Sequence, residues 1–221
     1  MLKHEKPQQF NWTDYITKLT DLPSLSSQWE KDMVCEITDK ISNTEIKRVL
    51  EVGCSNGRWL RWFCKEYDCE GYGVDNNAAG FRKRDMNFML GDAFKLPYRD
   101  NVFDVIFSMG LIEHFKKPHD FLLLKEQVRV LKNKGYLICE VPNLAVSLEY
   151  VYVKYFYDFK KGYKHFIKTH IQMMRYFKKL NLQIISSKFF GWFFERFNVR
   201  QLFNCSFTSQ EYMVIGVLDN K

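Results

Sequence analysis

Three acidic residues follow three short apolar segments in the first half of the chain, and each lies close to a glycine. Glu51 belongs to the run Val49-Leu50-Glu51-Val52-Gly53, Asp75 ends Gly71-Tyr72-Gly73-Val74-Asp75, and Asp92 follows Gly91. A carboxylate accepts hydrogen bonds from amino groups and from both hydroxyls of a diol. One acid after each of three successive segments therefore indicates a ligand with three separate donor groups.

The loop after the first segment, Gly53-Cys54-Ser55-Asn56-Gly57, distinguishes between two cofactor classes. A dinucleotide loop has the pattern G-x-G-x-x-G, because its middle glycine lets the backbone approach a pyrophosphate. Here Ser55 takes the middle position and Arg58 follows Gly57. The loop therefore favours a cofactor without phosphate. S-adenosylmethionine is such a cofactor: its amino and sulfonium groups suit Glu51, its ribose diol suits Asp75 and its adenine amine suits Asp92.

Apolar segments alternate with helix-like patterns between residues 48 and 142. The expected strands are Arg48–Val52, Gly71–Asp75, Met86–Leu90, Val102–Ser108 and Gly135–Val141, with helices through Trp59–Phe63 and over Phe121–Leu131. This alternation predicts an α/β fold with an open, doubly wound, mostly parallel sheet. Ligands bind beyond the carboxyl ends of the strands in such sheets. Gly53, Asp75, Asp92 and Ser108 all fall there.

The flanking sections are expected to cover this core. Two amphipathic helices, separated by Pro23, precede the first strand. After Pro142 the chain is dense in Tyr, Phe and Lys over residues 144–166, which predicts an inserted helix or lid. A helix over Thr169–Leu180 and strands over Gln183–Phe190 and Tyr212–Leu218 complete the pattern. We expect one domain over residues 1–221, with an N-terminal helical cover (1–46), a cofactor-binding core (47–142) and a substrate-shaping section that includes the last two strands (143–221).

Four motifs, taken together, resemble the class I S-adenosylmethionine-dependent methyltransferases, especially the small-molecule group of the ubiquinone and menaquinone methyltransferases. They are Val49–Gly57, Gly73–Asp75, Gly91–Tyr98, and Phe103–Ser108 continued by Leu111–His114. The resemblance implies a seven-stranded Rossmann-like sheet with an antiparallel last strand and S-adenosylmethionine as the cofactor. The cofactor contacts that it implies are Glu51, Gly53, Cys54, Gly57, Asp75, Asn76, Asp92, Ala93, Ser108 and Met109.

His114 is the candidate catalytic residue. Methyl transfer is an in-line displacement, so the protein mainly positions the nucleophile and excludes water, while a base assists a hydroxyl acceptor. His114 follows the fourth expected strand, with Glu113 beside it. A structural or binding role for His114 is the alternative. His165 and His170 begin the next helical section and are further candidates for the same cavity.

The acceptor is less constrained by the sequence. Residues 1–142 hold 21 basic and 21 acidic side chains, whereas residues 143–221 hold 12 basic and 5 acidic, with 19 of the 37 aromatics. Our preferred interpretation is methylation, at oxygen, of a small-molecule or lipid-linked acceptor that can be anionic. The first alternative is an RNA methyltransferase that uses this basic, aromatic section. The second is a non-catalytic subunit with the methyltransferase fold, in which the aromatics form an interface.

Composition narrows the setting. The net charge is +7, and no apolar run could act as a signal peptide or span a bilayer, which predicts a cytoplasmic protein with at most peripheral membrane contact. The six cysteines show no C-x-x-C pair and no Cys/His ligand spacing, so we expect reduced thiols and no metal site. The oligomeric state is not predicted.

Overall fold

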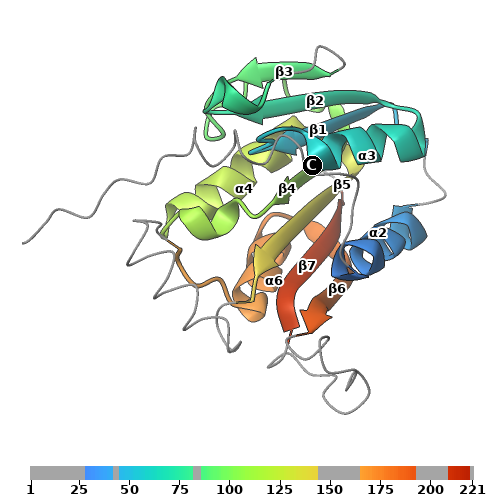
Figure 1. Ribbon diagram of the computed structural model, residues 1–221. Helices are drawn as coiled ribbons and strands as arrows, with labels where there is room; N and C mark the ends of the chain where they lie inside the picture. Colours follow the sequence, from blue (N-terminus) through green and yellow to red (C-terminus); the bar gives the residue numbers. More distant parts are fainter. Residues whose placement is uncertain (1–27, 42–44, 82–85, 144–164, 193–208, 220–221) are drawn as a thin grey trace, which may run out of the picture.

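The computed structural model describes residues 28–41, 45–81, 86–143, 165–192 and 209–219 (Figure 1). Its strands are β1 (Arg48–Val52), β2 (Glu70–Asp75), β3 (Asn87–Leu90), β4 (Phe103–Met109), β5 (Leu131–Pro142), β6 (Leu182–Trp192) and β7 (Ser209–Leu218). Its helices are α2 (Gln28–Ile41), α3 (Arg58–Tyr67), α4 (His119–Val130) and α6 (His170–Lys179), with short 3-10 turns η1 (Ala78–Gly80) and η2 (Ile112–His114).

The strands form one seven-stranded sheet in the order β3-β2-β1-β4-β5-β7-β6. The first five strands in this order are parallel, and β7 runs antiparallel to both β5 and β6. The predicted mostly parallel, seven-stranded sheet with an antiparallel last strand is confirmed. Because β1 to β4 run the same way, the residues that follow them meet at one edge.

Helices cover both faces of the sheet, with α2 and α3 on one face and α4 and α6 on the other (Figure 1). Apolar residues three or four apart explain these contacts, because they share one side of a helix. On one face Met33 and Ile37 of α2 pack in a core with Leu60 and Phe63 of α3. The opposite core contains Leu123, Leu124, Met173 and Phe177, from α4 and α6.

Several element boundaries differ from the sequence prediction. The helix expected to end at Leu131 ends at Val130, and β5 begins at Leu131, whose backbone is already extended. β7 begins at Ser209 instead of Tyr212, because it pairs with the far end of β6 at Trp192. The first predicted N-terminal helix lies outside the described residues, as does the aromatic segment except for His165 and Phe166, which are not helical.

Candidate functional site

A cavity of about 800 Å³ lies where the parallel strands end. The predicted site residues that line it are Glu51, Gly53, Cys54, Asp75, Asn76, Asp92, Ala93, Met109 and His114. Gly57 and Ser108 are not among its lining residues. Residues of strands β1, β2, β4, β5 and β7, the loop after β3 and helices α2 and α3 thus surround one space of a size typical for small-molecule sites.

Glu51 lies near the end of β1 and is only 3% exposed. One carboxylate oxygen accepts a hydrogen bond from the backbone N–H of Leu60, in the first turn of α3, at 3.1 Å. Burial raises the pKa of Glu51 well above its ordinary value, and this backbone hydrogen bond opposes the shift. The carboxylate has further lone pairs in the cavity, so a positively charged group is its natural partner there.

Asp75 ends β2 and fixes the loop after β1. Its two carboxylate oxygens accept hydrogen bonds from the N–H groups of Ser55 at 2.8 Å and Asn77 at 2.9 Å. Ser55 has a φ of 48°, so a serine adopts the left-handed backbone that glycine adopts more readily. Burial raises the pKa of Asp75, while the backbone donors lower it. Each oxygen keeps acceptor capacity, which suits a pair of ligand hydroxyls.

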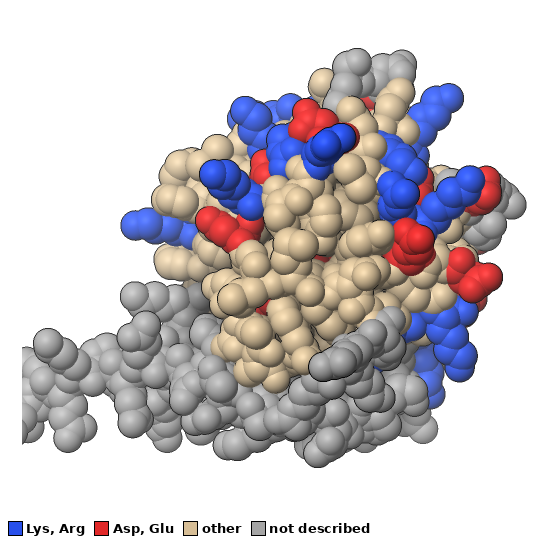
Figure 2. Space-filling view, turned by 90° about the horizontal axis from the view of Figure 1, so that it is seen from above, with Lys and Arg blue, Asp and Glu red and all other residues tan. Residues whose placement is uncertain are grey.

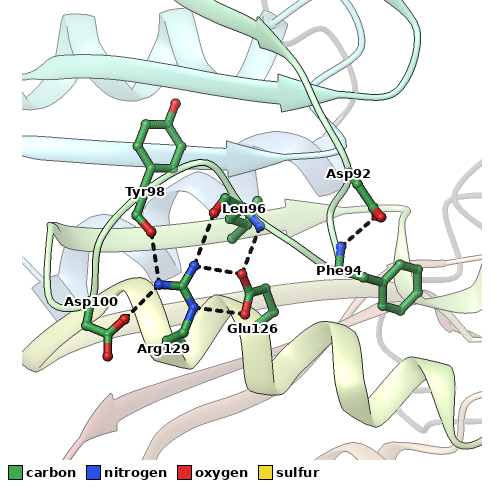
Figure 3. A network of polar contacts seen from close by, with 7 residues as sticks. All are labelled: Asp92, Phe94, Leu96, Tyr98, Asp100, Glu126 and Arg129. Carbon is green, nitrogen blue, oxygen red and sulfur yellow. Dashed lines mark hydrogen bonds and ion pairs between the residues drawn. The ribbon is translucent and has the colours of Figure 1, made fainter.

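Asp92 is an exposed residue at the rim of the cavity, in the loop after β3. Its side chain accepts the N–H of Phe94 at 2.9 Å, which fixes its orientation. Figure 3 shows how Arg129 of α4 holds the rest of this loop. The guanidinium donates to the carbonyls of Leu96 and Tyr98 and to the carboxylates of Asp100 and Glu126. The loop that carries Asp92 is therefore attached to a helix of the core.

The placement of Gly57, Ser108 and Cys54 follows from packing. Gly57 has a φ of 68°, and a Cβ on it would lie 2.4 Å from the ring of Phe88, so Gly57 allows the start of α3 to approach β3. The Ser108 hydroxyl is fully buried 3.6 Å from the Cys139 thiol, because alternate residues of β4 face opposite sides of the sheet. Burial raises the pKa of the Cys54 thiol.

Helix α2 contributes two lining residues, Trp29 and Glu30. Glu30, in the first turn of α2, forms an ion pair with Arg58 at the start of α3. Arg58 is the only lysine or arginine among the described residues that line the cavity, and it also lies over the Trp59 ring. Helical spacing predicts the inner face of α2, but nothing in the sequence indicates which element that face contacts. For that reason, the sequence does not predict the part of the site that α2 forms.

The carboxyl ends of β4 and β5 and the amino end of the antiparallel strand β7 form the other side of the cavity, which includes His114, His165 and Glu211. The N–H of Phe166 donates to the Glu113 carbonyl at 2.7 Å, which joins the chain after residue 164 to η2. The rings of His114 and His165 consequently lie 5.0 Å apart. His170 lies elsewhere, against Ser187 and the ring of Phe189, and does not line the cavity.

The deciding comparison is with protein families. Residues 50–139 match the family model described as a methyltransferase domain. Residues 50–139 therefore carry a methyltransferase domain. The resemblance inferred from the four motifs is confirmed over this region.

Relatives of the methyltransferase domain act on varied acceptors. It is 36% identical over 100 residues to phthiotriol/phenolphthiotriol dimycocerosates methyltransferase 1 of Mycobacterium ulcerans, covering 42% of this chain and 36% of that protein. It is 30% identical over 113 residues to the chloroplastic tocopherol O-methyltransferase of Arabidopsis thaliana, covering 46% of this chain and 32% of that protein. The chain thus spans about a third of the length of these relatives.

A solved structure supports the fold of the methyltransferase domain over most of the chain. A S-adenosylmethionine-dependent methyltransferase from Archaeoglobus fulgidus superimposes with a TM-score of 0.66 at 22% identity. The superposition covers 85% of this chain and 92% of that one. The likeness extends beyond the region that the family model matches, so β6 and β7 belong to the same sheet architecture.

The cavity presents the three carboxylates that the sequence predicts for contacts with S-adenosylmethionine. Glu51, Asp75 and Asp92 offer carboxylates to three separate groups, and each is oriented by a backbone N–H. In the described part of the chain, no three His, Cys, Asp or Glu side chains form a group that could hold a metal ion. None of the described helices combines the length and apolar character needed to cross a membrane.

Proposed function

We propose that this protein transfers a methyl group from S-adenosylmethionine to a small-molecule or lipid-linked acceptor, at an oxygen atom. The observation that carries this proposal is the convergence of Glu51, Asp75 and Asp92 on one cavity within a methyltransferase domain. The named relatives methylate lipids and other small molecules, which supports the acceptor class.

Each acid has a distinct role in the proposed site. Glu51, buried at β1, would bind the cofactor's amino group, since an ammonium stabilises its charged form. Asp75 would accept the ribose hydroxyls, because its oxygens are already oriented by Ser55 and Asn77. Asp92 and the backbone of Ala93 would border the adenine. When bound, S-adenosylmethionine supplies an electrophilic methyl group on its sulfonium.

The remaining residues would position the acceptor and exclude water. Met109 and Pro142 line the same cavity as His114 and supply apolar surface there. His114 would accept the proton that a hydroxyl acceptor releases on methylation. Its side chain is 19% exposed, and the nearby carboxylate of Glu113 can stabilise the imidazolium that results, at 3.9 Å between Nε2 and Oε1.

The RNA alternative is not favoured. The cavity is lined by six acidic residues, Glu30, Glu51, Asp75, Asp92, Glu113 and Glu211, which oppose a polyanion. On the face seen in Figure 2, lysines and arginines are interspersed with acids around a broad uncharged area. RNA-binding surfaces instead gather basic residues into a continuous strip.

The test of this proposal is calorimetric titration with S-adenosylhomocysteine. We expect wild type to bind and Asp75→Ala to bind about 10- to 100-fold more weakly, because hydrogen bonds to a charged group are lost. Asp39→Ala, which removes an exposed acid of α2, is the matched control and should bind like wild type. Undetectable binding to wild type would overturn the proposed function.

A further inference from the structure

The cavity has two chemically distinct sides. The acids assigned to the cofactor belong to β1, β2 and the loop after β3, on one side of the sheet order. On the other side, the ends of β4, β5 and β7 contribute Glu113, Pro142 and Glu211. Since the cofactor's donors are matched by the first side, the second side is where an acceptor must bind.

Glu113 is the decisive residue on the acceptor side. Glu113 lines the cavity, yet only 3% of its surface is exposed. Its Oε2 atom is buried and has no hydrogen-bond partner among the described groups. A buried carboxylate oxygen without a partner is costly, so this atom indicates a donor that a ligand supplies.

The surroundings of Glu113 strengthen the negative potential there. Glu211 lines the same part of the cavity, and the buried Glu140 lies near the end of β5, two residues before Pro142. Burial raises the pKa of Glu140 to about 7, and the charge of Glu113 adds to this shift. The only lining arginine, Arg58, is paired with Glu30 at the other side of the described cavity.

We infer that the methyl acceptor carries a cationic amino group and that Glu113 binds it, beside the atom that receives the methyl group. This inference rests on the proposed function and names its substrate class. An organic cation fits better than a metal ion, because the described acids and histidines do not form a metal-binding group. It also revises the expectation of an anionic acceptor, which came from residues 144–166 and 192–200, where most side chains lie outside the described part.

The inference is tested with three probes of one shape and different charge: benzylamine, benzyl alcohol and benzoate. Their affinities are measured by calorimetry at neutral pH, with saturating S-adenosylhomocysteine and with EDTA present. We expect wild type to bind benzylamine at least tenfold more tightly than benzyl alcohol, because an ammonium supplies the charged hydrogen-bond donor that the buried carboxylate of Glu113 lacks. Benzoate should bind most weakly.

Glu113→Gln keeps the shape of the side chain and should abolish the preference for benzylamine. Glu66→Gln, which changes an exposed acid of α3, should retain it. Equal affinity for benzylamine and benzyl alcohol in wild type would overturn the inference, as would an unchanged preference in Glu113→Gln. S-adenosylhomocysteine binding is measured separately, so intact cofactor binding without amine preference rejects this inference and leaves the proposed function standing.

Discussion

Ser55 holds a backbone conformation that the site imposes on it. Its φ is 48°, its N–H donates to Asp75, and its hydroxyl is buried without a hydrogen-bond partner among the described groups. The left-handed conformation costs a non-glycine residue about 1 kcal/mol. The strained backbone of Ser55 therefore lowers the stability of the loop, but it places the Ser55 N–H where it donates to Asp75.

Substitution of Ser55 tests this explanation. We expect Ser55→Gly to be neutral or to raise the free energy of unfolding by up to about 1 kcal/mol, since glycine adopts this φ without strain. Ser55→Val should lower it by more than about 1 kcal/mol, because a β-branched side chain is strongly disfavoured there. Urea denaturation measures both. A glycine variant that is clearly less stable than wild type would show that the hydroxyl stabilises the fold.

Glu140 predicts a pH dependence of stability. Burial raises its pKa in the folded protein from 4.5 to about 7. Between these two values the folded state binds a proton that the unfolded state has released, so this group makes stability fall as pH rises. The slope is at most about 1.4 kcal/mol per pH unit and disappears above pH 7.

Denaturation curves at pH 5, 6, 7 and 8 measure this effect in wild type and in Glu140→Gln. The variant has no titrating group at this position, so its stability should fall less between pH 5 and 7. The advantage of the variant over wild type should consequently grow across that interval. Curves that stay parallel over the whole range would contradict the assignment.

At the scale of elements, the loop after β3 depends on one side chain of α4. Arg129 uses its guanidinium donors on two backbone carbonyls and two carboxylates, and Glu126 in turn accepts the N–H of Leu96 at 2.8 Å. Lysine has no planar fork and cannot reproduce this arrangement.

Arg129→Lys should therefore lower the free energy of unfolding by about 1–2 kcal/mol, because the loop carbonyls lose donors. It should also weaken S-adenosylhomocysteine binding several-fold, since Asp92 is carried by this loop. Thermal denaturation and calorimetry measure the two effects. Arg99→Lys changes an exposed residue of the same loop and is the control. Full cofactor affinity in Arg129→Lys would mean that Asp92 is held independently of α4.

The sequence predicts those parts of the site that local patterns determine. Glu51, Asp75 and Asp92 could be placed because each follows a short apolar run near a glycine, and parallel strands bring such ends together. The pair Glu30–Arg58 could not be predicted, since it depends on how α2 packs against α3. Glu211 was missed because it reaches the cavity only through the pairing of β7 with β5.

For the whole molecule, cofactor binding should stabilise the fold. The cavity is built from α2, the start of α3, five strands of the sheet and their loops, so a bound ligand connects parts that are distant in sequence. A ligand at 100 times its Kd stabilises the native state by about 2.7 kcal/mol. For a chain of this size, that corresponds to a rise in Tm of about 5–10 °C.

Differential scanning fluorimetry with S-adenosylhomocysteine measures this rise. Glu113→Gln should show the same shift as wild type, because Glu113 is assigned to the acceptor. Asp75→Ala should show a reduced shift at the same ligand concentration. A full shift in Asp75→Ala would mean that the ligand stabilises the protein from another place.

The position of β7 also has a consequence for how the protein is made. β7 enters the sheet between β5 and β6, although it follows both of them in the sequence. During synthesis from the N-terminus, the strands that carry Glu51 and Asp75 emerge before β7, which carries Glu211. Until then β5 presents an open edge, which is prone to pair with other chains. The side of the cavity proposed for the acceptor is therefore completed after the side proposed for the cofactor, and we expect the nascent chain to be vulnerable to aggregation until β7 pairs with β5.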